Sequence, residues 1–206
     1  MKLPSKTIER LSQYRRVLIN VYSPTKQYVY SHEMANMLHN KPEQVRRDLM
    51  MIGYTTTLKK GYDIKELINH ITEILDANES VKVAIFGMGN LGKAITNYFI
   101  RKREKLKIVA AFDVDPDKIN KVISGIRCYH IEEMKNIIKK ENIAIAILTL
   151  PIEKAKEVTD QLVHAGVRGI LNYTSKPLYV PDYVYLEEYD MITSLEKLAY
   201  YVKISG

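Results

Sequence analysis

The segment from Val81 to Gly92 holds the residues whose types and spacing are best suited to ligand chemistry. It reads as an apolar strand that runs into a G-x-G-x-x-G turn and then into a helix beginning near Asn90. In such a turn Gly87 permits a tight bend, Gly89 lets the backbone approach a pyrophosphate, and Gly92 lets the helix pack closely on the strand. The pyrophosphate then lies against free N–H groups at the positive end of that helix. The segment predicts a dinucleotide site formed by Gly87, Met88, Gly89, Asn90, Leu91 and Gly92.

An acidic residue follows where a dinucleotide site needs one. A second apolar strand, residues 107–112, ends at Asp113, 21 residues after Gly92. A carboxylate at this position accepts hydrogen bonds from the adenosine ribose hydroxyls. No Arg or Lys adjoins Asp113 before Lys118, which favours NAD over NADP. The alternative is a glycine turn in an α/β domain that binds another ligand or none.

Strand and helix patterns alternate through the rest of the chain. Strands are expected at residues 126–129, 143–148, 168–171 and 183–187, with helices at 132–140 and 153–165. Continuous apolar strands separated by helices predict a parallel, doubly wound sheet, which binds ligands at the carboxyl ends of its strands. That rule adds Thr149, Leu150, Pro151 and Asn172 to the candidate site. Ordinary strand-to-helix loops explain these residues equally well.

Composition sets limits on the class of protein. With 206 residues the chain is long enough for one large domain or two small ones, and no apolar run approaches the ~20 residues of a membrane span. The N-terminus lacks the apolar core of a secretory signal. Cys128 is the single cysteine, so a reducing cytoplasm fits, and a buried apolar role is favoured over a redox role. We expect a cytoplasmic protein with no membrane partner.

The net charge of +7 lies entirely in residues 1–62, which hold 11 Lys and Arg against 4 Asp and Glu. The remaining residues hold 20 of each sign. A small basic region attached to a neutral nucleotide domain indicates a polyanionic partner for the N-terminus. A solvated basic surface is the alternative.

The basic region has the helix pattern of a DNA-reading module. A first helix, Pro4 to Tyr22, should bury one apolar face: Ile8, Leu11, Tyr14, Leu18 and Val21. Ser31 is a candidate N-cap for a short second helix, and Pro42 suits the first turn of a third, residues 43–52. Two short helices joined by a tight turn match a helix-turn-helix, whose second helix enters the major groove.

The third helix should face outward through Gln44, Arg46 and Arg47, residue types that read bases or grip phosphates. The β-prone stretch 54–62 after it resembles a wing with a Lys-Lys-Gly turn. The predicted DNA contacts are Ser31, Gln44, Arg46, Arg47, Lys59, Lys60 and Tyr62. The alternative is a helical interaction domain whose arginines form surface ion pairs.

The predicted fold class is α/β, with a winged helix-turn-helix domain at residues 1–76 and a Rossmann-like doubly wound parallel sheet at 77–188. The polar link Asp76–Ser80 marks the boundary. Residues 189–206 are expected to be a C-terminal dimerisation segment, whose amphipathic helix from Met191 to Lys203 can pack on its own domain or on a partner subunit. His130 and His164 have no obvious Asp or Arg partner, so we expect neither an enzyme nor a metal site.

The order of these features resembles the Rex family of redox-sensing transcriptional repressors along essentially the whole chain. The resemblance is carried by the segments 2–4, 10–11, 14–16, 44–49, 61–62, 87–92, 112–115, 146–151 and 166–173. It implies a homodimer with a C-terminal helix swapped onto the partner, which binds operator double-stranded DNA and leaves it when NADH, rather than NAD+, is bound. It also implies that Val114, Tyr98 and Met191 belong to the cofactor site, and that Arg16, Tyr98 and Asp190 form the switch.

The chain departs from the Rex pattern mainly in its DNA-reading part. Met50 stands where members usually carry Ser, Thr56 and Lys59 where they carry Gly, and Met191 where they carry Phe. An NAD(H)-binding regulatory paralogue with weak, altered or no specific DNA binding is therefore the main rival function. A CoA- or nucleotide-binding module and a small oxidoreductase are the others.

Overall fold

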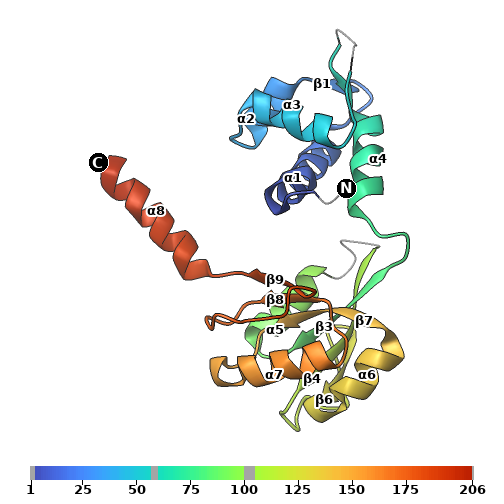
Figure 1. The fold of residues 1–206 in the computed structure, drawn as a ribbon, viewed down its shortest axis with the longest axis vertical. Coiled ribbons are helices and arrows are strands. Elements are labelled where there is room, and N and C mark those ends of the chain that lie inside the picture. The colour runs from blue at the N-terminus through green and yellow to red at the C-terminus, as the bar shows by residue number, and fades with distance from the viewer. Residues whose placement is uncertain (1–2, 57–59, 100–104, 206) are drawn as a thin grey trace. The chain divides into compact units, whose positions relative to one another are not determined.

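The polar segment Asp76–Ser80 separates two units of the chain. The computed structural model describes residues 3–56, 60–99 and 105–205, and it divides between Asn78 and Glu79 into an N-terminal and a C-terminal unit (Figure 1). Each unit has its own core of buried apolar side chains.

The N-terminal unit is a small helical domain with one short β-ribbon. Its elements are α1 (Ser5–Val21), β1 (Tyr28–Val29), α2 (Ser31–Met37), α3 (Pro42–Met51), β2 (Tyr62–Asp63) and α4 (Ile64–Leu75), and β1 pairs antiparallel with β2. The helices α1, α3 and α4 enclose a core in which Leu11, Leu49 and Ile71 are fully buried. This confirms the predicted helix order, and Lys59 of the predicted wing lies outside the described residues.

Two details of this unit differ from the sequence prediction. Ile8 is 44% exposed, because the buried stripe of α1 runs through Leu11, Tyr14 and Leu18 instead. Ser31 is the first residue of α2 and not its N-cap. Tyr30 is the N-cap residue, and its N–H donates a 2.7 Å hydrogen bond to the carboxylate of Glu33 in the first turn of the helix.

A seven-stranded sheet is the frame of the C-terminal unit. Its strands are β3 (Val81–Phe86), β4 (Leu106–Asp113), β5 (Val122–Ile123), β6 (Ile126–His130), β7 (Ile143–Leu148), β8 (Gly169–Asn172) and β9 (Tyr185–Glu188), in the order β5-β6-β4-β3-β7-β8-β9. All neighbours are parallel except β5 and β6. The strand order reverses at β3, which lies between β4 and β7. Nucleotides bind at such a switch point in doubly wound sheets.

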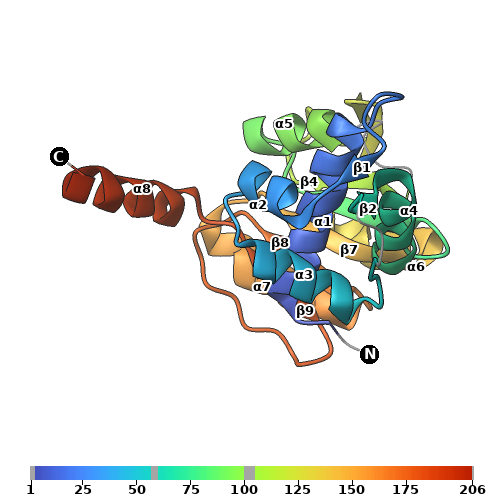
Figure 2. The same ribbon diagram turned by 90° about the horizontal axis from the view of Figure 1, so that it is seen from above.

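Helices cover both faces of this sheet (Figure 2). One face packs against α6 (Met134–Glu141) and α7 (Ile152–His164), with Phe86, Phe112 and Leu148 among the buried side chains. The other packs against α5 (Asn90–Phe99) around Ile85 and Met88. The doubly wound prediction is confirmed. The helix expected at 132–140 begins as a 3-10 turn, Ile131–Glu133, and β5 was missed because two residues carry no periodic signal.

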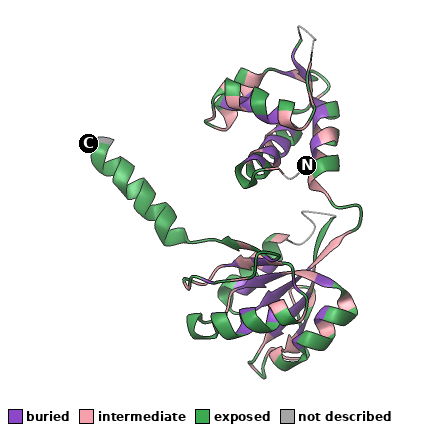
Figure 3. Cartoon of the chain, viewed as in Figure 1, coloured by how far each residue is buried: buried purple, intermediate pink, exposed green. Residues whose placement is uncertain are grey.

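The last helix, α8 (Met191–Ser205), contributes no described side chain to a hydrophobic core of this chain. Every side chain described along it, from Met191 to Ile204, is exposed, including Leu195 at 59% and Val202 at 74% (Figure 3). The amphipathic face predicted from the sequence is therefore not buried by this chain.

Candidate nucleotide-binding and DNA-binding sites

The turn after β3 is shaped by its two flanking strands. Gly87 adopts φ +99°, and its N–H donates a 2.8 Å hydrogen bond to the Phe112 carbonyl at the end of β4. A Cβ atom at Gly87 would lie 2.6 Å from the Thr149 carbonyl oxygen, so only glycine fits. The Thr149 hydroxyl, just beyond β7, donates a 2.7 Å hydrogen bond to the Gly87 carbonyl.

The other two glycines have different surroundings. A Cβ at Gly92 would collide with the Gly87 carbonyl oxygen, so the first turn of α5 packs directly on the loop. A Cβ at Gly89 would meet nothing within 4 Å. No protein atom therefore fills the space beside Gly89, whereas backbone atoms pack closely against Gly87 and Gly92. This geometry agrees with the steric roles expected of the three positions in a pyrophosphate-binding loop.

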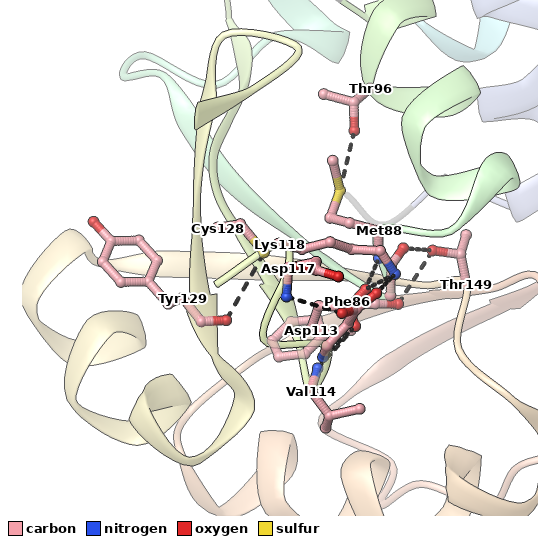
Figure 4. Close-up of polar contacts among 12 residues, drawn as sticks. Phe86, Met88, Thr96, Asp113, Val114, Asp117, Lys118, Cys128, Tyr129 and Thr149 are labelled. Atoms are coloured by element: carbon pink, nitrogen blue, oxygen red, sulfur yellow. Dashed lines mark hydrogen bonds and ion pairs between the residues drawn. The ribbon is translucent and has the colours of Figure 1, made fainter. Parts of the chain in front are cut away.

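Asp113 ties the end of β4 to this turn. Its Oδ2 accepts hydrogen bonds from the Met88 N–H at 2.7 Å and from Lys118 Nζ at 3.2 Å, and its Oδ1 accepts from the N–H groups of Val114 and Asp115 at 2.8 and 3.0 Å (Figure 4). Burial alone would raise the pKa of Asp113, but these hydrogen bonds outweigh burial and lower the pKa. Asp113 is therefore ionised at neutral pH and held in place.

A cavity of about 660 Å³ opens at the carboxyl ends of β3, β4 and β7. Its volume is in the range of about 300–1,000 Å³ found for small-molecule sites. Seven predicted residues line it: Gly87, Gly89, Asp113, Val114, Thr149, Leu150 and Pro151. The sequence analysis missed eight others: Phe112, Lys118, Ile131, Glu132, Lys154, Glu157, Val158 and Gln161. The last four share one face of α7, so the helical spacing after Pro151 was the signal that would have found them.

The remaining predicted cofactor residues do not line this cavity. Met88 is fully buried beneath the turn, and Asn90, Leu91 and Gly92 form the first turn of α5. Tyr98, near the other end of α5, is 63% exposed, and Met191 on α8 is 62% exposed.

The structure gives Asn172 a role inside the fold. Its side chain is buried, and its amide N–H groups donate to the Lys176 carbonyl at 2.8 Å and to Glu188 at 3.3 Å. Its amide oxygen accepts from the N–H and the hydroxyl of Thr174. The side chain thus fixes the loop after β8, and the prediction that it faces a ligand is not supported by this geometry.

Lys118, the first basic residue after Asp113 in the sequence, contacts Asp113 in the structure. Lys118 is five residues away in sequence, but the turn of the chain brings its ammonium to both Asp113 and Asp115, at 3.2 and 3.1 Å. Two carboxylates still outnumber one ammonium. The charge at this corner of the cavity therefore continues to oppose an added phosphate.

On the N-terminal unit, α3 carries the predicted DNA-reading side chains. Arg46 and Arg47 are exposed. Arg46 is also oriented, because it donates to Ser31 Oγ at 3.1 Å and pairs with Glu43 at 3.2 Å. The structure thus brings Ser31 of α2 and Arg46 of α3 together on one surface.

Gln44 does not face outward as predicted. Its amide donates a 3.0 Å hydrogen bond to Asp48, a fully buried residue on the same helix. Arg10 of α1 pairs with both oxygens of Asp48, at 2.6 and 2.7 Å, and the Tyr14 hydroxyl donates at 2.9 Å. Burial alone would raise the pKa of Asp48, but these partners lower it. The sequence analysis missed this network, which fastens α3 to α1.

Two predicted residues of the wing are described by the structure. Lys60 is exposed, with its ammonium 5.8 Å from the centre of the Tyr28 ring. Tyr62 is only 9% exposed and packs in the core, since its ring points inward from β2. Tyr62 therefore supports the wing and does not offer its ring to DNA.

Family models match the N-terminal and the C-terminal part of the chain, and known proteins match the chain as a whole. A family model for the CoA binding domain matches residues 78–176, and one for the N-terminus of a DNA-binding protein matches residues 2–49. A redox-sensing transcriptional repressor Rex of Anoxybacillus flavithermus is 38% identical over 205 residues, covering 100% of this chain and 96% of that protein. The chain belongs to the Rex family of redox-sensing transcriptional repressors.

Solved Rex structures have the same fold. A Rex-family repressor named RSP, crystallised with β-NAD+ and operator DNA, is 29% identical, with a TM-score of 0.90 over 100% of this chain and 94% of that one. RSP with β-NADH gives a TM-score of 0.87, also at 29% identity, over 100% of this chain and 96% of RSP. The CoA-binding match covers the nucleotide fold of this Rex protein and not its N-terminal unit.

Asp190 and Arg16 are two of the three switch positions expected of a Rex protein. In this chain Asp190 makes contacts within α8, and Arg16 is exposed. Asp190 accepts hydrogen bonds from the Ile192 N–H at 2.9 Å and the Thr193 hydroxyl at 2.7 Å, so it caps the start of α8. Arg16 is exposed on α1, whereas its neighbour Arg15 is buried and paired with Asp76 at 2.7 Å.

No helix among the described residues is long and apolar enough to cross a membrane, and no group of metal-binding side chains was found among them.

Proposed function

We propose that this chain is a repressor that binds operator DNA as a homodimer and is released from it when NADH binds, so that it reports the NADH/NAD+ ratio. The observation that carries this proposal is the combination, in one chain, of an open glycine turn beside a cavity and a basic helix-turn-helix unit. RSP, its relative, is described in complexes with NADH and with NAD+ plus operator DNA, which supports the same pairing of ligands.

In this proposal the dinucleotide lies across the turn from Gly87 to Gly92. Its pyrophosphate meets the N-terminus of α5 at the open Gly89, and its adenosine ribose meets Asp113. The loop Thr149–Pro151 forms one wall. We expect NADH to bind more tightly than NAD+, because the positively charged nicotinamide ring of NAD+ is poorly suited to apolar surroundings that Tyr98 and the partner's Met191 would form around it.

The DNA contacts proposed for the N-terminal unit are Arg46 and Arg47 on α3, Ser31 on α2 and Lys60 of the wing. Arg46 is held by Ser31 and Glu43, so it is positioned before DNA arrives. Arginine in this position on a recognition helix grips phosphate or reads guanine.

The second subunit is needed to bury α8. Its exposed side chains Ile192, Leu195, Leu198 and Val202 are unsuited to solvent. We propose that α8 inserts into the partner subunit. The functional division is then residues 1–76 for DNA, 77–188 for NAD(H) and 189–206 for dimerisation. Arg16, Tyr98 and Asp190 form the switch, and the protein acts in the cytoplasm without catalytic activity.

A gel shift with fragments of the source genome tests this function. The full-length protein should retard a subset of fragments at low salt, and NADH should abolish the shift whereas NAD+ should not. Retardation of no fragment, together with intact NADH binding, would favour the regulatory paralogue without specific DNA binding. Loss of NADH in the presence of a co-substrate would indicate an enzyme instead.

A further inference from the structure

All the acceptor positions of Asp113 are already used within the protein. A carboxylate offers about four lone-pair sites. Asp113 receives four donors: the N–H groups of Met88, Val114 and Asp115, and the ammonium of Lys118. A ribose hydroxyl can therefore gain a full hydrogen bond from Asp113 only where one of these donors withdraws.

Three of the four donors are fixed. The backbone N–H of Met88 belongs to the glycine turn, and those of Val114 and Asp115 belong to the turn that follows β4. Lys118 is the exception, because its donor is the end of a flexible side chain that is 24% exposed and lines the cavity. It also makes the longest of the four bonds, at 3.2 Å.

The Lys118 ammonium can keep an ion pair with Asp115 when its contact with Asp113 breaks. Asp115 lies 3.1 Å from the same ammonium and is 40% exposed, outside the set of residues that line the cavity. Withdrawal from Asp113 therefore does not leave the ammonium without an ion pair.

We propose that Lys118 competes with the adenosine ribose for Asp113: it occupies the carboxylate in the free protein and moves onto Asp115 when the ligand binds. The inference rests on the proposed NADH site. It makes Lys118 a residue that tunes the NADH concentration at which the sensor responds, and Asp115 the residue that makes the exchange possible.

If Lys118 competes with the ribose, substitutions of Lys118 and Asp115 should change the NADH affinity in the direction opposite to that expected from charge alone. NADH is an anion, so loss of a nearby lysine should weaken its binding electrostatically, and loss of a nearby aspartate should strengthen it. Removing Lys118 as a competitor should instead strengthen NADH binding, and removing Asp115 should weaken it. A partly exposed ion pair is worth up to about 1 kcal/mol, so Lys118→Met should tighten NADH binding by about two- to fivefold. Asp115→Asn should weaken it by a similar factor, because Lys118 then has only Asp113 to hold.

The experiment is a fluorescence titration of the full-length protein with NADH. It uses wild type, Lys118→Met, Lys118→Arg, Asp115→Asn and the double variant Lys118→Met/Asp115→Asn. Lys118→Arg keeps a competing cation and should bind like wild type. Lys139→Met removes the same charge from an exposed position on α6, outside the cavity, and should not tighten binding.

The proposal requires that Lys118→Met tightens binding, that Asp115→Asn weakens it, and that Asp115→Asn has no further effect once Lys118 is gone. Unchanged or weaker NADH binding by Lys118→Met would overturn it, as would tighter binding by Asp115→Asn. If Lys118→Met did not fold, the Asp115→Asn result would decide alone. A wild-type protein that binds no NADH would instead refute the proposed function itself.

Discussion

The Met88 N–H and the Asp113 carboxylate are joined by a 2.7 Å hydrogen bond that links the turn after β3 to the end of β4. Together with the bond from Gly87 N–H to the Phe112 carbonyl, it holds the shape of the glycine turn through contacts within the protein. The turn can therefore be tested by substitutions that separate its folding from its fit to a ligand.

Gly89→Val should abolish NADH binding and leave stability almost unchanged. A Cβ at Gly89 meets no protein atom within 4 Å, so the added side chain projects only into the space proposed for the pyrophosphate. NADH titration and thermal unfolding measure the two effects. Gly92→Ala is the contrasting variant, since its Cβ collides with the Gly87 carbonyl and should lower the melting temperature as well. Normal NADH affinity in Gly89→Val would refute the assignment.

Asp48→Ala should destabilise the N-terminal unit by about 1–3 kcal/mol, the usual cost of leaving hydrogen-bond donors in the interior without their acceptor. Asp48 is fully buried and accepts from Arg10 and Tyr14, so the variant leaves a guanidinium without its carboxylate. Urea unfolding measures the loss, and Glu9→Ala, an exposed acid on α1, is the control. NADH binding should persist, because the C-terminal unit has its own core.

The same carboxylate predicts a pH dependence of stability. The folded pKa of Asp48 is lowered, so its contribution is complete above the pKa of an unfolded aspartate, about 3.9, and is lost as the pH falls through the lower folded pKa. In acid, wild type and Asp48→Ala should therefore converge in stability. A difference that stayed constant down to pH 2 would mean that the network does not depend on the charge of Asp48.

Sequence predicted this fold well where the signal is local. The glycine spacing, the apolar strands and the helix predicted at residues 153–165 all depend on neighbouring residues, and the structure has each of them. The pairing of Arg10 with Asp48 joins residues 38 apart, and no periodicity reports it. Gln44 is different, because it lies one helical turn from Asp48 and its hydrogen bond to that buried carboxylate depends on where Asp48 is placed by the fold. Asn172 follows a strand as a ligand-binding residue would, yet its partners are Lys176 and Glu188.

Arg47→Ala should reduce the salt dependence of DNA binding by about one unit in the slope of log affinity against log salt. Each phosphate contact that is lost releases one counterion fewer. Arg47 is exposed on α3, so its loss should leave the fold intact. Binding isotherms at several salt concentrations give the slope. Lys135→Ala, which removes a charge from α6 of the other unit, should not change it.

Leu195→Asp should convert the proposed dimer into a monomer. Leu195 is 59% exposed on α8 in the single chain, so a charge there costs the isolated subunit nothing but opposes burial in a partner. Light scattering after size-exclusion chromatography gives the mass. Glu196→Asp, a neighbouring substitution that keeps the charge, should remain dimeric. A Leu195→Asp protein that stayed dimeric would place the interface elsewhere.

The proposed function requires that the nucleotide site and the DNA site are coupled. This coupling is measured by titrating NADH into a preformed complex of the protein with its operator, followed by fluorescence anisotropy of labelled DNA, with NAD+ as the parallel titration. NADH should release the DNA, NAD+ should release far less, and operator should weaken NADH binding by the same factor by which NADH weakens operator binding, about 5- to 150-fold. A complex that stays intact at saturating NADH would show that the two sites are not coupled.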